Sequence, residues 1–225
     1  MEKLAIVNLN NNKKTSKSPY IPEHLPQPPF RLVVIGSSNS GKSNMIKNLI
    51  TRDDEFGYKK HFGDNIIIFS KTLGLDSTWT SLKLPSSHLY REWKEDIVKK
   101  IMDYSKKQKN GVLLLLDDLI SDANAFNKKN SNLLTELFYT GRHYRISLCI
   151  TSQRLHAVPS GMLSNCSQMC VFALKTKRER ESFLEIVNNF ENLEQKYEYA
   201  VREPYSFIYL NLQTAKAYRN FEEEL

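Results

Sequence analysis

Residues 32–43 read LVVIGSSNSGKS and form the most informative local pattern in the chain. The first four residues are an apolar run rich in β-branched side chains and closed by Gly36, which predicts a buried strand. Beyond the glycine-rich segment, apolar residues recur at the spacing of one helix face. These residues are Met45, Ile46, Leu49 and Ile50. The sequence therefore predicts a buried strand, a glycine loop and an amphipathic helix in direct succession.

The glycine-rich segment fits the P-loop pattern G-x-x-x-x-G-K-S/T at every position. Glycine lets the backbone wrap closely around phosphate oxygens, and the amides at the following helix N-terminus point at the anion. In such a loop Lys42 bridges the β- and γ-phosphates, and Ser43 is a ligand of Mg²⁺. An ordinary glycine-rich turn is the alternative, and the flanking strand and helix argue against it. The expected nucleotide-binding residues are Gly36, Ser37, Ser38, Asn39, Ser40, Gly41, Lys42, Ser43 and Asn44.

A second apolar run ends in two acids. Four leucines, 113–116, precede Asp117 and Asp118, which is the form of a Walker B strand. A buried strand delivers Asp117 to the carboxyl edge of the sheet beside the P-loop, where it can hold the water shell of Mg²⁺. A second acid directly after it suits a general base that orients the attacking water. A helix N-cap pair is the alternative for two aspartates after a strand.

The next predicted strand, over 146–151, contributes polar candidates at both of its ends. Gln153 follows it and can sense the γ-phosphate or position water; a plain loop glutamine is the alternative. Arg142 precedes it, after Gly141, which stands where a helix-terminating glycine belongs. At the rim of the domain Arg142 can reach a neighbouring subunit's γ-phosphate as an arginine finger. Arg145 competes for this role, and a cation at a helix C-terminus is the alternative.

The rest of the chain predicts one α/β domain behind a tail. Further strands are expected over 65–70, 169–174 and 206–212, and helices over 92–104, 131–140 and 178–188. Buried strands alternating with helices indicate a doubly wound, mostly parallel sheet. Residues 1–29 are rich in Pro, Asn and Lys, which predicts a flexible tail before a P-loop domain over 30–225.

Composition excludes some classes of protein and permits others. No run approaches the ~20 apolar residues of a membrane span, and the polar N-terminus lacks a signal-peptide pattern, so neither a membrane span nor secretion is expected. Lys and Arg number 32 against 25 Asp and Glu, and the resulting charge of +7 permits a polyanionic partner. Three cysteines do not suggest a disulfide framework.

Several classes of P-loop protein can be compared on these motifs. A GTPase should carry an Asn-Lys-x-Asp motif, and the nearest string, NKKN at 127–130, lacks the acid. A small-molecule kinase should bring an Arg-rich lid, which residues 175–180 could supply. However, an extra strand over 65–70 stands between the P-loop and Asp117, and Gln153 ends the strand that follows. This layout matches RecA-like ATPases that add a strand and use a catalytic acid.

With these motifs the chain resembles the FtsK/HerA-type ATPases, and within them the genome-packaging ATPases of poxviruses, other large eukaryotic DNA viruses and virophages. The resemblance rests on residues 36–43, 113–118 and 141–153, and it covers roughly 30–212. It implies a homo-oligomeric ring that uses ATP and Mg²⁺ to drive double-stranded DNA into a capsid. In that family the catalytic acid maps to Asp118, the polar residue closing the next strand to Gln153, and the arginine finger to Arg142.

The resemblance also implies partners and a location: a capsid or virion component, in the host-cell cytoplasm, a viral factory or the virion. Two basic loops are candidates for non-specific phosphate contacts with DNA, 121–132 and 175–180, and an ordinary solvated surface is the alternative for each. Three other functions stay open on the motifs. They are an FtsK/HerA-like pump or helicase on non-viral DNA, a nucleoside or nucleotide kinase, and an assembly factor that binds ATP without appreciable turnover.

Overall fold

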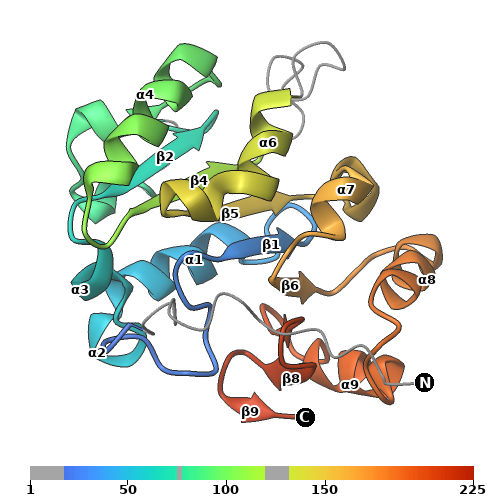
Figure 1. Ribbon diagram of the computed structural model, residues 1–225. Coiled ribbons are helices and arrows are strands. Elements are labelled where there is room, and N and C mark those ends of the chain that lie inside the picture. Colours follow the sequence, from blue (N-terminus) through green and yellow to red (C-terminus); the bar gives the residue numbers. More distant parts are fainter. Residues whose placement is uncertain (1–17, 75–77, 120–131) are drawn as a thin grey trace, which may run out of the picture.

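The computed structural model describes residues 18–74, 78–119 and 132–225. Nine strands within these ranges form one sheet in the order β3-β2-β4-β5-β1-β6-β7-β8-β9. The strands from β3 to β6 pair in parallel, and β7, β8 and β9 continue the sheet in antiparallel fashion (Figure 1). The predicted doubly wound, mostly parallel sheet is confirmed, with an antiparallel extension on one side.

Each predicted strand exists, with its bounds shifted by one or two residues. The strands are β1 Arg31–Ile35, β2 Ile66–Ser70, β3 Leu89–Tyr90, β4 Val112–Asp117, β5 Ile146–Ser152, β6 Gln168–Phe172, β7 Phe207–Asn211, β8 Lys216–Arg219 and β9 Glu223–Glu224. The strands missed by the sequence pattern, β3, β8 and β9, are short or partly exposed, so they carry little hydrophobic periodicity.

The described helices are α1 Lys42–Thr51, α2 Asp53–Phe56, α3 Tyr58–Phe62, α4 Glu95–Lys107, α6 Asn132–Thr140, α7 Ser160–Leu163, α8 Lys177–Ile186 and α9 Leu193–Ala200. Four of these helices, α1, α4, α6 and α8, correspond to predicted ones, and the others were not predicted. The predicted helix over 92–104 begins instead at Glu95, so that two acids lie in its first turn and two lysines in its last, where they complement the helix dipole. In α8 the Thr176 hydroxyl accepts from the Glu179 amide at 3.2 Å and caps the helix.

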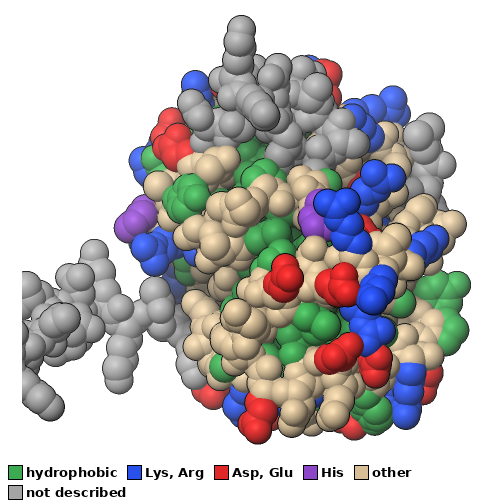
Figure 2. Space-filling model, turned by 90° about the vertical axis from the view of Figure 1, so that its right-hand side faces the viewer, with side chains coloured by type: hydrophobic (Ala, Val, Ile, Leu, Met, Phe, Trp, Pro, Cys, Tyr) green, Lys and Arg blue, Asp and Glu red, His purple; other side chains and the backbone are tan. Residues whose placement is uncertain are grey.

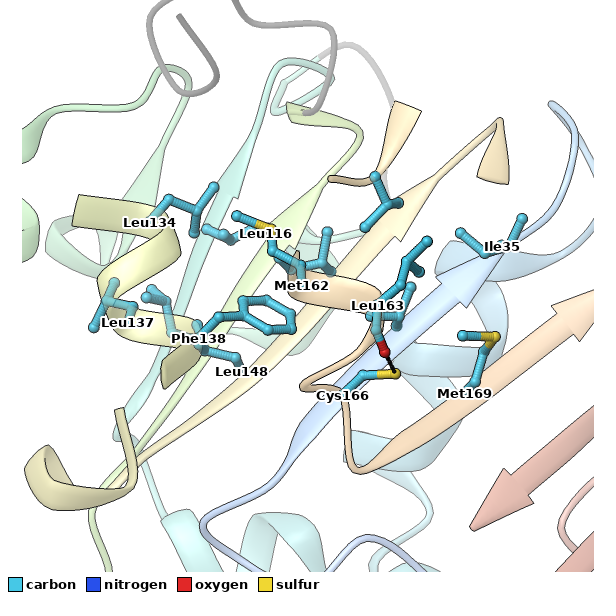
Figure 3. Close-up of a cluster of buried hydrophobic side chains, with 14 of the residues drawn as sticks. Ile35, Leu116, Leu134, Leu137, Phe138, Leu148, Met162, Leu163, Cys166 and Met169 are labelled. Atoms are coloured by element: carbon cyan, nitrogen blue, oxygen red, sulfur yellow. Dashed lines mark hydrogen bonds between the residues drawn. The ribbon is translucent and has the colours of Figure 1, made fainter. Parts of the chain in front are cut away.

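The sheet separates two hydrophobic clusters. Val112, Leu114 and Leu116 of β4 face the cluster that contains α4 and α6, whereas Leu113 and Leu115 face the cluster that contains α1 and α3. This alternation follows from the two-residue period of a strand. Figure 3 shows part of the first cluster, in which apolar side chains of α6 and α7 pack against β1, β4, β5 and β6. Burial of the strands on both faces positions their polar carboxyl ends rigidly.

The prediction that Gly141 follows the end of a helix is confirmed in position, but the glycine lacks the left-handed conformation typical of a helix-terminating glycine. Helix α6 ends at Thr140, but Gly141 does not adopt a left-handed conformation and instead begins a 3₁₀ turn, η4 Gly141–Tyr144. The left-handed residue is Arg145, with φ of 57°. Gly141 is buried, and a methyl group on it would lie 3.6 Å from the Ile146 carbonyl oxygen and 3.7 Å from Leu148 Cδ1. These are ordinary van der Waals distances, so neither close packing nor backbone conformation requires a glycine at this position.

Residues 18–29, assigned to the flexible tail on composition, pack against the domain. Ile21 and Leu25 are 4% and 1% exposed and belong to the cluster on the α1 face. The Tyr209 hydroxyl donates to the His24 carbonyl at 2.9 Å, and the Tyr58 hydroxyl donates to the Pro26 carbonyl at 3.0 Å. A proline-rich segment can be held this way because side-chain donors satisfy its carbonyl groups without regular secondary structure. Residues 1–17 of the predicted tail lie outside the described residues.

Cys149, Cys166 and Cys170 are all free and buried. Burial raises the pKa of the Cys166 thiol to about 12, and it raises the pKa values of the other two as well. Within the ranges that the structure describes, no helix has the length and apolar character to cross a membrane.

Candidate functional site

The sheet topology brings the predicted site residues to one edge. The P-loop follows β1, while Asp117 ends β4 and Gln153 follows β5. In the sheet β5 lies directly between β1 and β4, so the strand that separates the P-loop from the Walker B acid is β5. The strand over 65–70 precedes Asp117 along the chain but lies on the far side of β4. The expected additional strand is therefore present. It is β5, whereas the order of the chain pointed to the strand over 65–70.

The P-loop has the tight geometry that its glycines permit. A methyl group on Gly36 would lie 2.5 Å from Ser40 Oγ and 2.9 Å from Phe172 Cβ, so the loop could not close over β6 with any larger residue there. Gly41 has a φ of 103°, a conformation that L side chains rarely adopt. The Met45 amide donates to the Gly41 carbonyl at 2.8 Å, which starts the hydrogen-bond ladder of α1.

Lys42 is a buried cation held by neutral groups. The residue is only 7% exposed, and its Nζ donates to the carbonyls of Gly36 and Ser37 at 2.8 and 3.0 Å. Burial lowers its pKa, and the nearby charges of Asp118 and Asp117 oppose that shift. No carboxylate lies within ion-pair distance of Nζ among the described residues. A buried ammonium whose printed hydrogen bonds go to carbonyl groups, inside a glycine-rich loop at a helix N-terminus, fits an anion such as phosphate.

Asp117 is the centre of the hydrogen-bond network at this edge. It is 4% exposed. Its Oδ1 accepts from the Thr151 hydroxyl at 2.8 Å and from the Ser43 hydroxyl at 3.3 Å. Its Oδ2 accepts from Trp79 Nε1 at 3.0 Å and from the Ser70 hydroxyl at 3.1 Å. The Ser43 contact places a P-loop hydroxyl beside a carboxylate, which is the oxygen donor set that Mg²⁺ prefers.

Asp118 and Gln153 form a second pair beside the first. The Gln153 side-chain amide donates to Asp118 Oδ2, and the Asp118 amide donates to the Thr151 hydroxyl at 2.9 Å. Asp118 has a φ of 53°, so the extended backbone of β4 ends at Asp117. Asp and Asn tolerate this left-handed conformation better than most residues. Thr151 therefore links the two acids, and Gln153 fixes the carboxylate of the second one.

A cavity opens next to this pair. It has a volume of about 310 Å³. Its lining includes Ser37 and Ser38 of the P-loop, Gln153, and residues 173–176 after β6. The cavity thus adjoins the first residues of the P-loop and the amide that contacts Asp118.

Arg142 lies at the amino ends of the parallel strands, whereas the site lies at their carboxyl ends. It is exposed within η4, directly before the start of β5, whereas Gln153 follows the end of that strand. Arg31, at the start of β1, has its pKa lowered by burial and by the charge of Arg142. Arg145 Nη1 instead donates to the Gln108 carbonyl at 3.1 Å. The structure therefore brings Lys42, Ser43, Asp117, Asp118 and Gln153 together and does not bring Arg142 to them within one chain.

The two predicted DNA-contacting loops differ in what the structure describes. Residues 121–131, with Lys128 and Lys129, lie outside the described residues. Residues 177–180 of the second candidate belong to α8, where Arg180 pairs with Glu194 at 2.9 Å and with Glu198, and Lys177 pairs with Glu181 at 3.6 Å. Figure 2 shows positive and negative side chains interspersed on the face that it presents. Much of the charge of the second loop is thus balanced within the chain.

Three residues that donate hydrogen bonds to Asp117 were not predicted. Ser70 ends β2 directly opposite Asp117, and Thr151 belongs to β5, so both could be found as polar residues at the carboxyl ends of buried strands. Trp79 comes from the segment between β2 and β3, and only the fold shows that its indole reaches Asp117. No local sequence pattern marks this residue.

Fold and site together define a P-loop NTPase with an additional strand between the P-loop strand and the Walker B strand. The family model of the Poxvirus A32 protein matches residues 86–195 of this chain. The "Uncharacterized protein 015R" of Frog virus 3 (isolate Goorha) is 25% identical over 149 residues, which are 63% of this chain and 43% of that protein. The chain thus spans less than half the length of this relative.

Solved structures agree in fold. B204, the DNA-packaging ATPase from Sulfolobus Turreted Icosahedral Virus, matches with a TM-score of 0.63 and 18% identity, over 85% of this chain and 97% of that chain. The genome packaging NTPase B204 from Sulfolobus turreted icosahedral virus 2, in complex with AMPPCP, matches with a TM-score of 0.57 and 17% identity. This match covers 85% of this chain and 97% of that chain. The resemblance to viral genome-packaging ATPases is thereby confirmed, in sequence by the poxvirus match and in fold by B204.

Proposed function

We propose that this chain is a Mg²⁺-dependent ATPase that works as a homo-oligomeric ring and drives double-stranded viral DNA into a capsid. The observation that carries the proposal is the network around Asp117, which joins the P-loop hydroxyl of Ser43 to the Asp118–Gln153 pair through Thr151. The matches to the Poxvirus A32 family and to B204 support DNA packaging as the work done. On this proposal the protein acts in the host-cell cytoplasm, a viral factory or the virion, and docks on a capsid component.

The residues present fit ATP and Mg²⁺. The buried ammonium of Lys42 and the P-loop amides would hold the phosphates, and Ser40 Oγ is buried without a hydrogen-bond partner in the described structure. Ser43 and Asp117 would hold Mg²⁺, directly or through its water shell. The metal supplies charge neutralisation on the phosphate oxygens. Ser70, Trp79 and Thr151 keep the Asp117 carboxylate oriented, since each donates a hydrogen bond to it.

Asp118 is proposed as the general base. The Gln153 amide and the backbone geometry at φ of 53° fix its carboxylate next to the cavity beside the P-loop. A carboxylate placed there can accept the proton of an attacking water, and Gln153 can report whether the γ-phosphate is present. Both roles need the side chains at the carboxyl edge of β4 and β5, which is where the sheet holds them.

A DNA-dependent hydrolysis assay tests the proposal. We expect long double-stranded DNA to stimulate steady-state phosphate release several-fold, and the stimulation to fall as salt rises because the contacts are with backbone phosphates. Lys42→Ala should reduce hydrolysis to background, while Lys47→Ala on the same helix should behave as wild type. Turnover that ignores DNA would contradict a motor acting alone, and turnover that requires a small acceptor would instead indicate a kinase.

Arg142 is proposed as the finger that acts in a neighbouring subunit. It is exposed at the edge opposite its own P-loop, and the competing Arg145 is held by the Gln108 carbonyl, which favours Arg142. Arg142→Ala and Lys42→Ala should each lose hydrolysis by about 10²-fold or more. A mixture of the two variants should regain activity, since the intact P-loop of one meets the intact arginine of the other.

The mixing experiment can also assign the role to the other arginine. The same mixture made with Arg145→Ala in place of Arg142→Ala tests that alternative. Rescue confined to the Arg145 mixture would move the finger to that residue, and an Arg142→Ala variant with full activity would remove Arg142 from the mechanism.

A further inference from the structure

The turn between α9 and β7 lies at the P-loop edge of the sheet because β7 runs antiparallel to β6. Phe207, the first residue of β7, pairs with Phe172, the last residue of β6. Residues 201–206 therefore come to the edge where the parallel strands end. Tyr205 lies in this turn, and neither the P-loop motif nor the Walker B motif includes it.

Tyr205 is in contact range of the P-loop, and its ring is open to solvent. A methyl group on Gly41 would lie 3.4 Å from Tyr205 Cδ1 and 3.6 Å from its Cβ. Tyr205 is nevertheless 73% exposed, compared with 52% for Tyr20 and 43% for Tyr139. Contact with the P-loop thus leaves most of the aromatic surface uncovered.

The backbone of this turn is held in an unfavourable conformation. Tyr205 has a φ of 65°, which is rare for a bulky side chain. The Ser206 amide and hydroxyl both donate to the Glu203 carbonyl, at 3.2 and 2.6 Å. The Glu203 carboxylate in turn pairs with Arg219 of β8 at 2.7 Å. Neighbouring groups thus hold the strained conformation, and strain of this kind concentrates at ligand sites.

The order of the strands indicates which part of a nucleotide would meet Tyr205. Asp117, Asp118 and Gln153 come from β4 and β5, on one side of the P-loop strand β1, and they serve the terminal phosphate on the proposed function. Tyr205 directly precedes β7, on the other side of β1, and lies beside Gly41 at the end of the loop. If the terminal phosphate lies toward β4 and β5, the base leaves the loop on the side of β6 and β7.

We propose that the exposed ring of Tyr205 is the stacking platform for the base of the bound nucleotide. The inference rests on the proposed function, since it requires a nucleotide in the P-loop. Stacking on an aromatic face tolerates any base, so Tyr205 supplies affinity for the base and does not choose between purines.

The test compares two ligands that share phosphates and differ in the base. Calorimetric titration of the full chain with ATP and with inorganic tripolyphosphate, each with Mg²⁺, gives the two dissociation constants. Tyr205→Gly removes the ring and suits the positive φ, so it should fold at least as well as wild type. We expect it to weaken ATP binding about tenfold and to leave tripolyphosphate binding unchanged. Tyr205→Phe should bind ATP as wild type does, and Tyr20→Ala is the matched control at an exposed tyrosine.

The outcomes separate this inference from the proposed function. Equal weakening of both ligands by Tyr205→Gly would show that the residue only supports the loop, and no weakening of ATP binding would remove it from the site; either result overturns the inference. Failure of the proposed nucleotide site is recognised differently, because Lys42→Ala would then bind both ligands as well as wild type does.

Discussion

Asp118→Asn is expected to slow ATP hydrolysis by about 10²- to 10⁴-fold and to leave ATP binding nearly unchanged. Asparagine cannot accept the proton of the attacking water, but it keeps the size of the side chain. It also tolerates the φ of 53° at this position, where alanine would add strain. The substitution therefore removes the chemistry of the carboxylate with little change in the backbone.

Single-turnover hydrolysis and equilibrium binding of ATP, measured on the same preparation, check this expectation. Asp103→Asn, at an exposed position of α4, is the matched control and should behave as wild type. Hydrolysis at the wild-type rate in Asp118→Asn would exclude this residue as the base. A parallel loss of ATP affinity would instead place its role in binding.

Asp117→Ala is expected to lower the free energy of unfolding by about 3 kcal/mol, because it leaves buried donors without an acceptor. Trp79 Nε1 and the Thr151 hydroxyl lose their acceptor in the interior, and the Ser70 hydroxyl loses its contact with Asp117 and keeps only those with Thr72. The same variant should lose the Mg²⁺-dependent part of its ATP affinity, since the carboxylate beside Ser43 is gone.

Urea denaturation followed by tryptophan fluorescence measures the first effect. Asp64→Ala removes a carboxylate that is 74% exposed and paired with Lys59 at 2.8 Å, so it should leave the free energy of unfolding nearly unchanged. A loss for Asp117→Ala as small as that of this control would mean that the network contributes little to stability.

The parts of the fold that were predictable are those in which one local pattern dominates. The run 113–116 predicts β4 because a strand buried on both faces has no polar alternation. The same argument places Asp117 and Asp118 at the carboxyl edge. The P-loop was equally accessible, since its glycines and its lysine are required by the geometry of the loop itself.

The rest depends on contacts between segments far apart in the chain. Ile21 and Leu25 are isolated apolar residues among prolines, and their burial follows only from the folded cluster, which also contains residues of α1, α3 and β7. Trp79 and Tyr205 lie in irregular segments, so their positions near the site follow from the strand order rather than from a motif. The assignment of the additional strand was incorrect for the same reason, because the order of strands along the chain differs from their order in the sheet.

The two outermost strands of the described sheet limit how copies of this chain can meet. β3 and β9 each contain two residues, and both residues of β9 are glutamates. Short, charged margins are poor templates for adding a strand, which protects against edge-to-edge aggregation. Assembly by continuation of the sheet is therefore disfavoured, and contacts between copies are left to loops and helices such as the turn that carries Arg142.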